Sequence, residues 1–248
     1  MDTDEIRQLY CSGTASVCAG RYADAIPWFE RILVSEPDSI PALVALAASL
    51  DRLGLFSESI ICCDQALNVD PRASDALFIK GLALFRLARN SDAIPCFDGV
   101  LAEKPDHAEA YFMKGNALYQ IGDKRGAIRC FDETLRIREK YPKALYNKGV
   151  SLGDLGEYEE ALACYDACLA MNPGIAIVLA NKGVVLALMR HYAEAERVLL
   201  EAVSIDPNDS TVWSNLGICY SRTGRDNLAI QAFAKARDLV GGKGQILR

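Results

Sequence analysis

Residues 210–243 read STVWSNLGICYSRTGRDNLAIQAFAKARDLVGGK, and this stretch decides the fold because its pattern returns along the whole chain. Small residues at Gly217 and Ala229 stand at fixed distances from large ones at Tyr220 and Phe233. The same spacing is marked upstream by prolines 34, 34, 68 and 34 residues apart, at Pro37, Pro71, Pro105, Pro173 and Pro207. A fixed period of this length indicates a repeat architecture.

Seven repeats account for nearly the whole chain of 248 residues. Their predicted bounds are 6–39, 40–73, 74–107, 108–141, 142–175, 176–209 and 210–243. Residues 1–5 form a short N-terminal leader and residues 244–248 a C-terminal tail. No segment is left over for a second domain.

Within each repeat, small and large residues alternate as two closely packed helices require. The eighth place is Gly13, Ala47, Gly81, Gly115, Gly149, Gly183 or Gly217, and the twentieth is Ala or Ser. Four residues later on the same helical face stand Phe29, Cys63, Phe97, Phe131, Tyr165, Leu199 and Phe233. Since the second repeat has Ala47, Ser59 and Cys63 at these places, we expect its packing to be the loosest.

A glycine at the fifteenth place supplies the left-handed residue that ends the first helix in five repeats. Ala88 and Arg190 replace it in the third and sixth repeats. These two repeats are therefore expected to turn differently.

The pattern resembles the tetratricopeptide repeat family, most fully in the seventh repeat, where Trp213, Leu216, Gly217 and Tyr220 are followed by Ala229, Phe233 and Ala236. The resemblance implies an all-α fold, a right-handed α-solenoid superhelix of seven antiparallel helix pairs. It also implies that the first helices line a concave groove with places 2, 5, 6, 9, 12 and 13 of each repeat.

Composition excludes several classes of function. The net charge of −6 offers no general attraction to nucleic acid or anionic membranes. No signal peptide or apolar run of about 20 residues is present, and nine cysteines without a secretion signal favour a reducing cytoplasm. Cys164 and Cys168 have helical spacing, but with two histidines in the chain we expect packing thiols and no metal.

Large apolar residues gather at the groove places of the third to fifth repeats, whereas the first two repeats offer mild surfaces such as Val44, Ala45 and Ala48. Contiguous apolar side chains that reach solvent usually mark binding surfaces. The apolar residues are Phe78, Ile79, Leu82, Phe85, Phe112, Met113, Tyr119 and Tyr146. From these we predict a peptide-binding wall of Phe78, Phe112, Met113, Tyr119 and Tyr146. The alternative is that several of them pack against neighbouring helices as core.

Asparagines recur at the sixth place of three consecutive repeats, at Asn147, Asn181 and Asn215. An amide side chain can pair with both the N–H and the C=O of an extended peptide. The family resemblance implies such a role for this asparagine ladder, and Asn116 joins the predicted site. The alternative is three solvated side chains.

A lysine ladder occupies the seventh place, at Lys80, Lys114, Lys148 and Lys182. It would attract an acidic ligand, but we favour stems that pack along the helices and heads that reach nearby acids.

No nucleophile elbow, phosphate-binding loop or dinucleotide fingerprint appears, so neither enzyme activity nor a cofactor is expected. The predicted function is a non-enzymatic protein–protein interaction scaffold whose groove binds an extended or helical, partly apolar peptide. Two alternatives stay open. One is a self-assembling repeat protein whose groove or C-terminal face is filled by another copy, and the other is the recognition arm of a larger protein.

Overall fold

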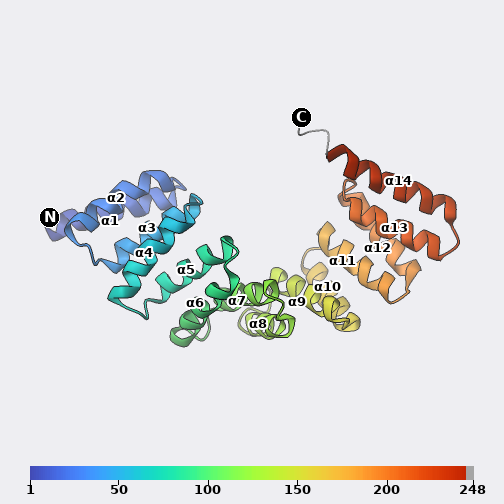
Figure 1. Ribbon diagram of the computed structural model, residues 1–248, viewed down its shortest axis with the longest axis horizontal. Helices are drawn as coiled ribbons and strands as arrows, with labels where there is room; N and C mark the ends of the chain where they lie inside the picture. Colours follow the sequence, from blue (N-terminus) through green and yellow to red (C-terminus); the bar gives the residue numbers. More distant parts are fainter. Residues whose placement is uncertain (244–248) are drawn as a thin grey trace. The chain divides into compact units, whose positions relative to one another are not determined.

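The computed structural model describes residues 1–243, so the predicted tail 244–248 lies outside the described residues. The described residues form fourteen α-helices, shown in Figure 1. Their bounds are α1 Thr3–Cys18, α2 Tyr22–Ser35, α3 Ile40–Arg52, α4 Phe56–Val69, α5 Ser74–Arg86, α6 Asn90–Glu103, α7 Ala108–Gln120, α8 Lys124–Ile137, α9 Pro142–Leu155, α10 Tyr158–Met171, α11 Ala176–Leu188, α12 Tyr192–Ile205, α13 Ser210–Arg222 and α14 Asp226–Lys243. None of these helices is long and apolar enough to cross a membrane.

The helices pack in sequential pairs, which confirms the predicted all-α repeat fold (Figure 1). Each odd-numbered helix is the first helix of its repeat and lies against the even-numbered second helix that follows it. From α3 onward, every first helix begins at the residue that opens its repeat. Helix α1 begins earlier, at Thr3, because the Asp2 carboxylate caps it by accepting a 2.7 Å hydrogen bond from the Glu5 amide.

The chain divides into two compact units, each with its own core. The N-terminal unit spans residues 1–137 and holds α1–α8, with first helices α1, α3, α5 and α7 in successive contact. The C-terminal unit begins at Arg138 and holds α9–α14, with α11 in contact with both α9 and α13.

The seam between the helices of a pair depends on a glycine facing a large side chain. A Cβ added at Gly81 would stand 2.7 Å from the ring of Phe97, and one at Gly115 equally close to Phe131. In the second repeat both residues of the seam differ, because Ala47 stands at the place of the glycine and the smaller Cys63 at the place of the aromatic residue. We expected the loosest packing in this repeat, yet Ala47 and Cys63 are both fully buried.

The predicted difference in the turns of the third and sixth repeats is wrong. Ala88 and Arg190 adopt φ of 58° and 65°, the left-handed conformation that glycine adopts in the other five repeats. The hydrogen bonds match as well, because the amide of Arg89 reaches the Leu84 carbonyl at 2.9 Å just as Arg21 reaches Ser16. The packing of the helix pair therefore imposes the turn even on residues that pay a steric cost for it.

Candidate functional site: the groove face of the first helices

The groove face is defined here as the residues at places 2, 5, 6, 9, 12 and 13 of the first helices. In the third to seventh repeats nearly all of them are half-buried or exposed, with Phe112 and Ala180 as the buried exceptions. Places 3 and 10 of the same five repeats are buried. The first helices therefore present a distinct surface that is accessible to a ligand within each unit.

Three aromatic side chains of the predicted wall, Phe78, Phe112 and Tyr146, pack on the second helix of their own repeat. Phe78 meets Phe97 edge to face with ring centroids 6.1 Å apart, and it also lies 4.9 Å from the ring of His107. Phe112, only 9% exposed, lies 6.0 Å from Phe131. These rings thus contribute to packing of the helix pairs, and Phe78 keeps part of its surface accessible.

The remaining members of the wall are half-buried. Met113 packs against the core around Leu84 and Phe97, and its sulfur lies 3.8 Å from the Asn116 amide. Tyr119 is also half-buried. In the C-terminal unit, the ring of Tyr146 lies 6.4 Å from that of Tyr165.

The asparagine ladder lies within the C-terminal unit, and its members differ in their contacts. Asn181 donates its amide N–H to the hydroxyl of Tyr146 at 2.9 Å, which joins α11 to α9. Asn215 donates to the Thr211 carbonyl of its own helix at 2.9 Å. Neither amide oxygen accepts a hydrogen bond from a described residue, so Asn181 and Asn215 each keep an acceptor for a ligand. Asn147, the third member, is half-buried on α9.

Burial raises the pKa of Tyr146, and the hydrogen bond from Asn181 opposes this shift. The Tyr146 hydroxyl therefore stays protonated at neutral pH. A neutral hydroxyl that already accepts from Asn181 still has its own proton to donate. Tyr146 and Asn181 together present a donor and an acceptor on adjacent first helices.

The lysine ladder pairs with aspartates of the preceding repeat. Lys80 lies 2.5 Å from Asp64, and Lys114 lies 2.5 Å from Asp98. Lys182 pairs in the same way with Asp166. The hydrogen bond with Asp64 raises the pKa of Lys80. For these three lysines the reading that their heads reach nearby acids is confirmed, and their charges are compensated within the fold.

Two further ion pairs, which the repeat pattern alone does not reveal, join consecutive repeats. In the N-terminal unit, Arg86 on α5 reaches the carboxylate of Asp51 on α3 at 2.5 Å. Asp51 is 5% exposed, and its Oδ1 atom has no hydrogen-bond partner among the described residues. Burial raises the pKa of Asp51, although the charge of Arg86 opposes the shift.

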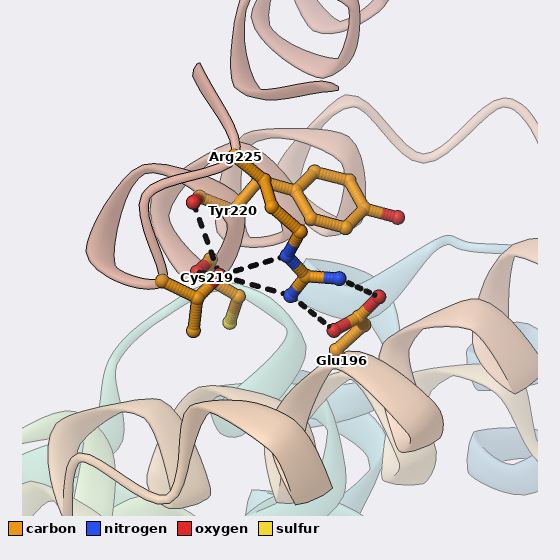
Figure 2. Close-up of polar contacts among 5 residues, drawn as sticks. Glu196, Cys219, Tyr220 and Arg225 are labelled. Atoms are coloured by element: carbon orange, nitrogen blue, oxygen red, sulfur yellow. Dashed lines mark hydrogen bonds and ion pairs between the residues drawn. The ribbon is translucent and has the colours of Figure 1, made fainter. Parts of the chain in front are cut away.

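The second of these ion pairs lies at the junction of the sixth and seventh repeats (Figure 2). Arg225 donates to both carboxylate oxygens of Glu196, at 2.9 and 2.5 Å, and its guanidinium lies 4.8 Å from the ring centroid of Tyr220. The first five repeats have Ile or Leu at the place of Glu196. A polar pair therefore replaces an apolar contact at this junction.

The structure also reveals two hollows that the sequence analysis did not single out. One, of about 510 Å³, lies in the N-terminal unit between Tyr10, the groove face of α3 and the start of α5. The other, of about 600 Å³, lies between α13 and α14 beside Phe233 and Val240. Phe233 is 42% exposed, whereas the residue at its place is buried in each of the other six repeats.

Cys164 and Cys168 are both buried, and the described residues contain no group of three or more His, Cys, Asp or Glu side chains placed to hold a metal ion. The Cys168 thiol lies 3.5 Å from the Pro142 carbonyl. These contacts are those of packing residues.

Comparison with known proteins follows the repeat pattern. Family models described as tetratricopeptide repeat match residues 80–144, 142–174, 176–209 and 198–231. No curated protein sequence matches the chain.

Solved structures share the fold at low sequence identity. A tetratricopeptide repeat protein from Parabacteroides merdae ATCC 43184 is 19% identical, with a TM-score of 0.70 over 95% of this chain and 93% of its own. YrrB, a TPR protein with an unusual peptide-binding site, is 21% identical with a TM-score of 0.68 over 74% of this chain and 95% of its own. MamA from Desulfovibrio magneticus RS-1 is 22% identical with a TM-score of 0.66, over 68% of this chain and 96% of its own.

Proposed function

Because the chain belongs to the tetratricopeptide repeat family, whose members mediate protein–protein interactions, we propose that it is a non-enzymatic scaffold that binds a partly apolar peptide segment of a partner protein on the groove face of its first helices. The observation that carries the proposal is the pair of amide oxygens on Asn181 and Asn215 that accept no hydrogen bond from a described residue. An extended peptide supplies backbone N–H groups to such acceptors. YrrB, which shares the fold, is a TPR protein with a peptide-binding site.

The predicted residues form two sets of proposed contacts, one in each unit. The N-terminal unit holds Phe78, Phe112, Met113, Asn116 and Tyr119, and the C-terminal unit holds Tyr146, Asn147, Asn181 and Asn215. In the C-terminal unit we assign the backbone contacts to the asparagine ladder, since none of its three residues is fully buried. The half-buried faces of Phe78 and Tyr146 supply apolar contact, and Phe112 supports the wall from beneath. The nine free thiols fit a reducing compartment, and we propose the cytoplasm.

The experiment is affinity capture from native cell extract with three versions of the protein. The first is wild type, the second carries Asn147→Ala, Asn181→Ala and Asn215→Ala, and the third carries the same change at the exposed Asn68, Asn208 and Asn227. Circular dichroism verifies that all three are equally helical. We expect partners that wild type and the exposed-site control retain and the ladder variant loses; equal capture by all three contradicts the role of the ladder.

Self-assembly is a second candidate function, favoured by the exposed apolar face of the last described pair. Phe233 and Val240 are 42% and 63% exposed and line the hollow between α13 and α14. Another copy packed on this face would bury both side chains. Sedimentation equilibrium at ~100 μM, a concentration that detects weak association, tests it. Val240→Lys should lower the mass of any oligomer and Val34→Lys, at an exposed site on α2, should not; a monomeric wild type removes the candidate.

A further inference from the structure

The hollow in the N-terminal unit lies where the sequence has the smallest groove-face residues. Its volume of about 510 Å³ falls in the range of about 300–1,000 Å³ that is usual for ligand pockets. Its lining includes Tyr10 on α1, Val44, Ala45 and Ala48 on α3, here called the floor, and Asp70 and residues 72–75 before and at the start of α5.

Three consecutive groove places of α3 explain why the hollow is there. Places 5, 6 and 9 hold Val44, Ala45 and Ala48, where the third repeat has Phe78, Ile79 and Leu82. Because these side chains are smaller, they leave an apolar floor. All three residues are half-buried, so solvent reaches part of this floor. Covering this solvent-exposed apolar floor with a partner side chain makes a favourable contribution to the free energy of binding.

Side chains on both sides of the hollow contact other residues of the unit. The ring of Tyr10 packs edge to face on the buried Phe29, with centroids 5.8 Å apart. On the opposite wall, Asp75 accepts a 2.8 Å hydrogen bond from Lys104. Because Tyr10 already packs on the buried Phe29, a ligand that binds beside it needs little further ordering of that ring.

The rim of the hollow has an excess negative charge. Arg72 lies 3.8 Å from Glu103, and Lys104 is paired with Asp75, so both cations of this region already face carboxylates. Asp70 accepts a 2.9 Å hydrogen bond from the Arg72 amide but forms no ion pair with a described residue. The rim therefore favours a basic group and disfavours an acidic one.

We propose that this hollow is a side-chain pocket of the groove face, and that it receives a bulky apolar side chain, aromatic or branched aliphatic, from a partner peptide that has a lysine or arginine next to that residue. This proposal rests on the peptide-binding function proposed above and specifies the chemistry of its ligand. The apolar side chain lies on Val44, Ala45 and Ala48 against Tyr10, while the basic neighbour faces Asp70.

The probe is a phage-displayed library of random dodecapeptides selected on the wild-type protein, followed by titration of synthetic versions of the enriched peptides. The proposal expects enriched sequences in which a large apolar residue adjoins Lys or Arg. Ala48→Trp fills the hollow and should weaken these peptides at least tenfold, and Ala48→Leu should weaken them less. Asp70→Asn should weaken them about two- to fivefold, as expected for an exposed charge pair.

Ala163→Trp on the exposed face of α10 is the matched control and should leave affinity unchanged, and circular dichroism verifies that each variant is folded. Enriched peptides that bind Ala48→Trp as tightly as wild type overturn the pocket. If those peptides are nevertheless lost by the asparagine-ladder variant, the peptide-binding function stands and only the pocket fails. A selection that enriches no peptide contradicts both.

Discussion

The glycine and aromatic side chain that face each other across a helix pair should behave as one coupled unit. The third repeat pairs Gly81 with Phe97, and the second repeat pairs Ala47 with Cys63. The perturbation is to convert the first pair into the second by Gly81→Ala and Phe97→Cys, singly and together. If the two places are coupled, the double variant should be more stable than the sum of the single changes predicts.

The structure sets the magnitudes. A Cβ at Gly81 would stand 2.7, 2.9 and 3.1 Å from three atoms of the Phe97 ring, which is fully buried. Overpacking of this kind costs about 1–3 kcal/mol, less about 1 kcal/mol gained because alanine favours the helix, so Gly81→Ala should destabilise by about 1 kcal/mol. Phe97→Cys leaves a cavity and should cost about 3 kcal/mol. In the double variant the methyl group occupies part of that cavity, and we expect a total near 2 kcal/mol instead of about 4.

The assay is urea unfolding followed by circular dichroism, with amide hydrogen exchange to localise the effect to α5 and α6 because repeat proteins need not unfold in one step. The reverse cycle, Ala47→Gly with Cys63→Phe, is the internal control and should show coupling of the same sign. Single and double changes that add within about 0.5 kcal/mol in both cycles would refute the reasoning.

Three further predictions concern single positions. Ala88→Gly relieves a left-handed alanine and should stabilise the protein by about 0.5–1 kcal/mol in urea unfolding, whereas Gly122→Ala should destabilise it; equal midpoints would show that the turn carries no strain. Because burial raises the pKa of Asp51 above 3.8, the folded state binds its proton more tightly than the unfolded state does. The stability of wild type relative to Asp51→Asn should therefore fall as pH rises above 3.8, and a pH-independent difference would contradict this. Burial raises the pKa of Cys63 to about 12, and six other thiols are also buried. A thiol reagent should therefore modify only Cys11 and Cys18 quickly in native protein and all nine cysteines in urea. A third cysteine that reacts quickly in native protein would be inconsistent with the packing.

The fold was predictable because each local signal agreed with the others. Pro41 and Pro142 stand in the first turn of α3 and α9, where the missing amide is tolerated, and the small residues of each repeat stand where helices approach most closely. The turns at Ala88 and Arg190 were mispredicted because residue preference was given more weight than tertiary packing. The packing of the two helices of a repeat imposes the same turn here as in the five repeats that have glycine at this place. A cost of about 1–2 kcal/mol for one left-handed residue is too small to change that turn.

The candidate site was less accessible to sequence reasoning. The sequence pattern singled out large apolar residues such as Phe112, yet that ring is buried and lies beside Phe131. The hollow beside Tyr10 is made by the absence of large side chains at Val44, Ala45 and Ala48, and a search for large residues passes over it. Comparing the same place across repeats would have found it, whereas the bond from Asn181 to Tyr146 depends on side-chain geometry that a sequence does not contain.

The most direct test of peptide recognition by the first helices is crosslink mapping. A library-selected peptide is synthesised with a photoreactive benzoyl-phenylalanine in place of its large apolar residue, irradiated on the wild-type protein, and the adducts are located by mass spectrometry. We predict adducts at groove-face residues of first helices, either α1, α3, α5 or α7 in the N-terminal unit or α9, α11 or α13 in the C-terminal unit. Adducts confined to second helices such as α4, α10 or α12 would contradict the groove face as the binding surface.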